Sequence, residues 1–199
     1  MKSFWLVLVI LFTTGIAACQ TRISTRDPIH IGVSGSYAAM SLDDLIEKSD
    51  TIIIGQVKTV YPSRWTTSDG KLPSGFTERE VIQKDLSIIT DYEITVERTL
   101  KGSSEQNVIR IRKEGGVVGQ DSMTVSGDVP LGMNKTYLFF LSLDTKGATA
   151  NIGPEHYWIS GGDMQGLHEI VDDKAISGVG DEWNLDDLLE YIRSKLERN

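Results

Sequence analysis

From residue 51 onward, hydrophobic and polar positions follow the two-residue period of β-strands. In "DYEITVER" (91–98), apolar and polar residues alternate, which predicts one buried face and one face in water. In "NVIRIRK", Ile109 and Ile111 are expected on the buried face and Arg110 and Arg112 on the wet face. β-branched and aromatic residues predict strands at 51–61, 90–100, 107–113, 122–127 and 136–142. Three further short strands are expected near 148–152, 157–160 and 167–171, with turns at "DTKG" and "VDDK".

Two segments have a helical period instead. Ser41 is an N-cap with Asp44 three residues later, so a short helix begins there. Near the C-terminus, Asn184 is the N-cap of a longer segment whose leucines and Ile192 form one apolar stripe. Many short strands with few helices are typical of a closed or nearly closed antiparallel barrel. We therefore expect a mainly β fold, with a single domain at 41–199 that carries a short N-terminal helix and a C-terminal amphipathic helix.

The N-terminus has the layout of a secretory signal: Lys2, the apolar run 4–12 and then small residues. The run is shorter than the roughly 20 residues that a membrane-spanning helix needs. Ile16, Ala17, Ala18 and Cys19 resemble the lipobox of bacterial lipoproteins. This resemblance implies a signal peptide at 1–18, diacylglyceryl attachment to the Cys19 sulfur and cleavage before Cys19. An ordinary cleaved signal and an uncleaved anchor are the alternatives.

Acyl chains on Cys19 would hold the protein at a bacterial cell membrane or outer membrane, facing outside the cytoplasm. Residues 19–40 are rich in Ser, Thr and Gly and are expected to form a flexible tether, although an additional strand near "IHIGV" is an alternative. Removal of 1–18 takes away one lysine and no acid, so the mature charge is −9. That sign argues against nucleic acid as a partner.

The order "SDTIIIGQVKTV", "YEITVERTLKG", "VIRIRKEGG" and "LGMNKTYLFFL" resembles a group of bacterial lipoproteins and secreted domains, over roughly residues 49–142. It is more distantly similar to the netrin-like module of tissue inhibitors of metalloproteinases. The resemblance implies an oligonucleotide/oligosaccharide-binding (OB)-like β-barrel. The mechanism of those inhibitors uses an unmodified N-terminal cysteine, so it is not expected where Cys19 carries lipid.

No catalytic constellation, metal site or cofactor motif is predicted. The three histidines His30, His156 and His168 do not have a metal-ligand spacing. "EHYW" and "LHEI" each place a carboxylate beside a histidine, but adjacent residues of a strand point to opposite faces. An envelope hydrolase or metal-dependent enzyme that uses His156, His168 and nearby acids therefore remains the alternative function.

The segment 62–87 is a long connection between two strands, and long loops in compact domains are often binding loops. Trp65 and Phe76 can form an aromatic contact surface there. The alternative is that both rings cover the end of the barrel and that a short helix at "TEREVIQKD" shortens the loop. We expect a lipid-anchored, non-enzymatic binding module for a protein or another envelope ligand, with 62–87 as the candidate binding loop.

Overall fold

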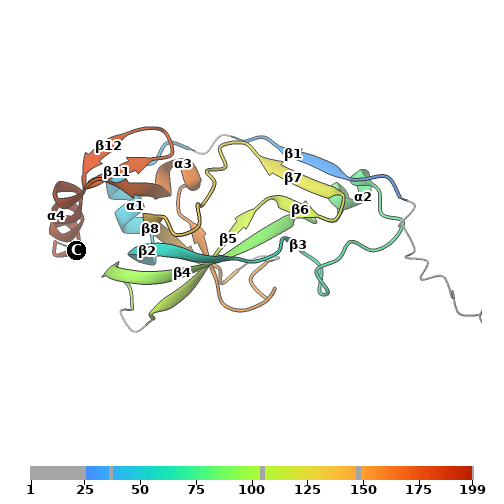
Figure 1. Ribbon diagram of the computed structural model, residues 1–199, viewed down its shortest axis with the longest axis horizontal. Helices are drawn as coiled ribbons and strands as arrows, with labels where there is room; N and C mark the ends of the chain where they lie inside the picture. The colour runs from blue at the N-terminus through green and yellow to red at the C-terminus, as the bar shows by residue number, and fades with distance from the viewer. Residues whose placement is uncertain (1–25, 36–37, 104–105, 147–148, 199) are drawn as a thin grey trace, which may run out of the picture.

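The structure is a computed structural model that describes residues 26–35, 38–103, 106–146 and 149–198 (Figure 1). The expected signal peptide and Cys19 lie outside these residues. The strands are β1 (His30–Val33), β2 (Thr51–Val60), β3 (Arg64–Trp65), β4 (Ile88–Lys101), β5 (Val108–Glu114), β6 (Gly116–Val118), β7 (Asp121–Val125), β8 (Thr136–Leu143), β9 (Tyr157–Ile159), β10 (Leu167–Val171), β11 (Lys174–Ser177) and β12 (Glu182–Asn184). The helices are α1 (Leu42–Lys48), α2 (Glu78–Gln83), α3 (Asp163–Gly166) and α4 (Leu185–Leu196).

Five strands close into a barrel. β8 pairs with β2, β2 with β4 and β4 with β5, and β9 completes the ring by pairing with both β5 and β8. Every pair in the ring is antiparallel except β5 with β9, which run parallel where Ile111 faces Tyr157. The expected OB-like barrel is therefore confirmed, and the strand pattern alone does not reveal its one parallel pair.

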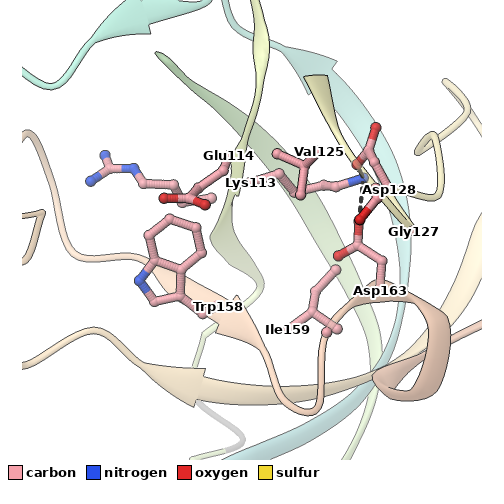
Figure 2. A pocket seen from close by; sticks show the side chains of 11 residues that line it. Lys113, Glu114, Val125, Gly127, Asp128, Trp158, Ile159 and Asp163 are labelled. Carbon is pink, nitrogen blue, oxygen red and sulfur yellow. Dashed lines mark ion pairs between the residues drawn. The ribbon is translucent and has the colours of Figure 1, made fainter. Parts of the chain in front are cut away.

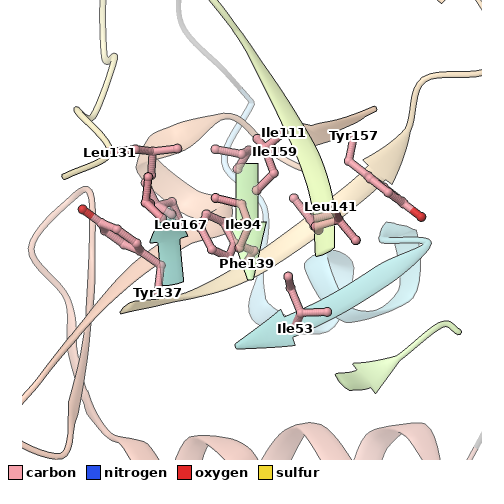
Figure 3. Close-up of a cluster of buried hydrophobic side chains, with 12 residues drawn as sticks. Ile53, Ile94, Ile111, Leu131, Tyr137, Phe139, Leu141, Tyr157, Ile159 and Leu167 are labelled. Atoms are coloured by element: carbon pink, nitrogen blue, oxygen red, sulfur yellow. The ribbon is translucent and has the colours of Figure 1, made fainter. Parts of the chain in front are cut away.

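Twelve buried side chains fill the barrel (Figure 3). Ile109 and Ile111 point inward, as the alternation predicts. The register between β2 and β4 shifts beside Gly55. A Cβ atom on Gly55 would lie 2.6 Å from the Ile94 Cγ2 atom, so only glycine lets the two strands approach this closely.

β10, β11 and β12 extend the sheet outward from β8, and α1 and α4 pack on it in a second buried cluster (Figure 1). Both expected N-caps are confirmed: the side chains of Ser41 and Asn184 accept hydrogen bonds from backbone N–H groups three residues later. The "VDDK" turn joins β10 to β11, with positive φ at Asp172 and Asp173 as in a type I′ turn. Residues 149–152 form turns, so the strand expected near 148–152 is wrong there.

A smaller sheet of β1, β7 and β6 lies at the other end of the molecule from α4 (Figure 1). β1 pairs in parallel with β7, so that His30 faces Ser122 and Val33 faces Val125. Residues 26–35, which the sequence places in the tether, therefore belong to the fold, as the alternative of an additional strand near "IHIGV" predicts.

Candidate functional site

A groove with a volume of about 710 Å³ lies beside the outer sheet, between α1, α3 and the turn from β11 to β12. Residues from four parts of the sequence that are far apart build it: 35 with 39–45, 126–127, 164–168 and 177–183. Its apolar surface comes from Met40, Leu42, Leu45, Met164, Val179 and Trp183. Concave, mainly apolar sites with a few polar groups are typical of ligand sites.

The walls of the groove are held by a side chain of α3 and by Ser126, which directly follows β7. Gln165 accepts a hydrogen bond from the Met40 backbone N–H at 2.6 Å and donates one to the Ala38 carbonyl at 3.2 Å. The Ser126 hydroxyl accepts a hydrogen bond from the Gly35 backbone N–H at 3.2 Å. These contacts attach the chain before α1 to the barrel, so the groove has a defined shape.

A smaller pocket of about 290 Å³, whose lining includes several charged side chains, shares Ser126 and Gly127 with the groove (Figure 2). In it, Lys113 forms ion pairs with Asp128 and with Asp163, the latter at 2.7 Å, and also donates to the Val129 carbonyl. Burial lowers the pKa of Lys113, but the two carboxylates outweigh it and raise the pKa above its ordinary value. All three ammonium hydrogens are used, so Lys113 is a structural clamp that holds α3 and the 126–129 loop on β5.

His168 lines the groove from β10, and its side chain is the unusual group of this site. The residue is only 4% exposed, its ring lies 5.8 Å from that of Phe140, and the buried Nδ1 atom has no hydrogen-bond partner among the described residues. Burial lowers the pKa of His168 to about 4, although the Asp181 carboxylate opposes the shift. The imidazole is therefore neutral at pH 7.

Stability should fall in acid because of His168. In the unfolded chain, the His168 imidazole has the ordinary histidine pKa of 6.5. In the folded chain its pKa is about 4, so the folded protein binds this proton only at lower pH. The contribution of neutral His168 to the free energy of unfolding is fully present above pH 6.5. It should decrease by about 3 kcal/mol as the pH falls toward 4. Urea unfolding of the wild type and of His168→Phe at pH 7, 6 and 5 measures it, because the variant lacks this dependence.

His30 supplies the matched control for that measurement, since it is an exposed histidine on β1. His30→Phe should retain the full decrease in the free energy of unfolding. An identical pH dependence in wild type and His168→Phe would contradict the burial of a neutral imidazole.

His156 lies in a different site, so the two histidines of the alternative enzyme do not meet. Its Nε2 atom is 2.8 Å from Asp144 and 2.9 Å from the Nη1 atom of Arg112. Arg112 is fully buried and forms a bidentate pair with Asp91 at 2.7 and 3.0 Å. Burial alone would raise the pKa of Asp91, but Arg112 and then Arg64 hold it below its ordinary value. Within the described part of the chain, no group of three or more metal-ligating side chains occurs.

The prediction that Arg112 lies on the solvent-exposed face of β5 is therefore wrong, because its side chain is fully buried. The guanidinium also donates to the carbonyls of Thr149 and Ile152, at 3.1 and 2.8 Å. The loop between β8 and β9 thus folds over this part of the strand and is held there by one buried cation.

The loop 62–87 does not offer the expected aromatic contact surface. Trp65 is completely buried with Val81, Ile88 and Met123, and its indole N–H donates to Asp121 at 3.3 Å. Phe76 packs partly buried against the same cluster. The structure thus agrees with the alternative, in which both rings cover buried side chains instead of forming a contact surface. The expected short helix is α2.

No helix in the described ranges is long and apolar enough to cross a membrane. No protein-family model and no curated protein matches this chain. The fold and the site thus define only a structural class of protein, which is a closed five-stranded barrel with an apolar groove beside its extended sheet. The groove residues, and not the 62–87 loop, form the candidate site.

Proposed function

We propose that this protein is a lipid-anchored binding module of the bacterial cell envelope, and that it holds its ligand in the groove without catalysing a reaction. The observation that carries the proposal is the groove itself, a concave and mainly apolar surface of about 710 Å³ whose lining includes His168 and Asp181. Concave, mainly apolar surfaces with a few polar groups are typical of sites that bind a ligand.

The placement in the envelope rests on Ile16, Ala17, Ala18 and Cys19, whose order resembles a lipobox. Two or three acyl chains on Cys19 give stable attachment, whereas one chain binds only marginally. The bacterial cell membrane and the outer membrane both fit this anchor, with the barrel facing outside the cytoplasm.

Photo-crosslinking in the cells that produce the protein tests the proposal. The probe is p-benzoylphenylalanine at Val179, which lines the groove and is 53% exposed. Ultraviolet light should give a discrete adduct, which mass spectrometry then characterises. The matched control is the probe at Val117, which is 63% exposed on β6 at the other end of the molecule.

The adduct should form at Val179, not at Val117, and should disappear when Ala39→Trp fills the groove. Equal adducts at both positions would mean that contacts are random, and no adduct at Val179 would mean that the groove is not a binding site. Either result overturns the proposal.

A further inference from the structure

The negative charge of the protein is concentrated in the half that contains the groove. Segments 41–50 and 163–198 hold 14 of the 28 acidic residues but only five of the 20 basic ones, a net charge of −9. The rest of the chain has 14 acidic and 15 basic residues and is close to neutral. These two segments supply α1, α3 and β10 to β12, which line the groove, and α4, which packs on the same part of the sheet. A ligand that approaches this half therefore meets an attractive field only if it is positively charged.

One carboxylate of this half lies in the groove itself. Asp181 lines the groove, and its side chain forms no hydrogen bond or ion pair with any residue that the structure describes. Its charge acts on the His168 ring. The polar groups offered to a ligand are therefore an unpaired carboxylate and an unpaired, neutral imidazole.

The groove also opens beside the free edge of a sheet. β12 is the first strand of the nine-stranded sheet and pairs only with β11, so its other edge has no strand partner among the described residues. Trp183 of β12 lines the groove and is 43% exposed, although it is a large aromatic residue. A free strand edge next to an apolar groove favours an extended peptide, because its backbone can pair with the edge while alternate side chains enter the groove.

We propose that the groove binds a basic segment of a partner protein, extended along β12 with its apolar side chains in the groove and its cationic side chains near Asp181. This inference rests on the proposed function and names the chemistry of its ligand. Trp183 packs on the apolar side chains, and His168 forms a hydrogen bond with a polar group of the segment.

The position of the groove fits a partner that is not in the same membrane. Arg26 forms an ion pair with Asp121 at the β7 end of the molecule, opposite α4 and β12 (Figure 1). Cys19 and Arg26 are seven residues apart in the sequence, so at most about 25 Å separates them even in an extended chain. A lipid on Cys19 therefore places the β1–β7 end toward the membrane and presents the groove at the far end.

Fluorescence anisotropy tests the charge and the apolar character separately. The full chain with its lipid is held in phosphatidylcholine nanodiscs, so that the membrane itself has no net charge. Three labelled peptides of equal length serve as probes: alternating Leu and Lys, alternating Leu and Glu, and alternating Ser and Lys. The Leu/Lys peptide should bind at least about tenfold more tightly than either of the others, and its binding should weaken as salt increases.

Charge reversal at one groove residue provides the matched comparison. Asp181→Lys should weaken binding of the Leu/Lys peptide by about tenfold. Glu190→Lys makes the same charge change on α4, outside the groove, and should alter Kd by less than about twofold. Neither side chain forms an ion pair with a residue that the structure describes, so the two variants differ mainly in the position of the new charge.

Each of the remaining outcomes would overturn a specific part of this inference. Equal affinity for Leu/Lys and Leu/Glu peptides would refute the selection for basic ligands, and equal affinity for Leu/Lys and Ser/Lys would refute the use of the groove. Failure of all three peptides would overturn this inference. The proposed function would still stand if the cross-link at Val179 forms, so the two failures are distinguishable.

Discussion

Replacing Arg112 with leucine should lower the free energy of unfolding by about 3–5 kcal/mol, the usual cost of breaking a buried ion pair from one side. The substitution leaves the Asp91 carboxylate buried with only the partly exposed Arg64 beside it, at 2.8 Å. It also removes the donors to the carbonyls of Thr149 and Ile152. Urea unfolding followed by circular dichroism measures the change.

Arg110→Leu is the control on the same strand. Arg110 is half-buried, and its guanidinium lies 4.6 Å from the centre of the Tyr61 ring, so its loss should cost no more than about 1 kcal/mol. The double variant Asp91→Leu, Arg112→Leu should be less destabilised than the sum of the two single variants, because neither charge is then left alone. Equal losses for Arg110→Leu and Arg112→Leu would contradict the role of the buried pair.

Replacing Cys19 with serine should abolish lipid attachment completely. A hydroxyl does not form the thioether that lipoprotein modification requires, and cleavage before residue 19 follows that modification. Cells that express Cys19→Ser and receive labelled palmitate should contain an unlabelled precursor that retains residues 1–18. Intact mass and label incorporation in the purified protein provide the measurement.

Gln20→Ser is the neighbouring control, since it keeps the thiol and changes the next side chain. It should be labelled and processed like the wild type. A Cys19→Ser protein with the mature mass of the wild type would refute the lipid anchor and would favour an ordinary signal peptide.

The barrel was predictable because its determinants are local. Alternation at Ile109 and Ile111 places the core face of β5, and the side-chain oxygens of Ser41 and Asn184 begin the two helices where the sequence predicts them. These signals act between residues that are close in the chain. The same reasoning fails at Arg112, because a loop more than 30 residues away covers it.

The groove was not predictable for a related reason. Its residues come from four distant segments, and each has an ordinary role when the sequence alone is considered: Trp183 precedes a helix, Val179 lies in a turn and His168 is one residue of a strand. Trp65 shows the reverse case. An aromatic residue in a long polar segment suggests a surface, but the Trp65 ring packs in a buried cluster with Val81, Ile88 and Met123, and its indole N–H donates to Asp121.

The parallel pairing of β1 with β7 has a mechanical consequence for a protein held by its N-terminus. If the anchor pulls on Arg26 while a partner holds the groove, tension runs along β1, which lies along the length of the molecule (Figure 1). The four residue pairs from His30 with Ser122 to Val33 with Val125 are then loaded together in shear, and not one after another as in a zipper. Under such a load, β1 would therefore resist extraction of the chain.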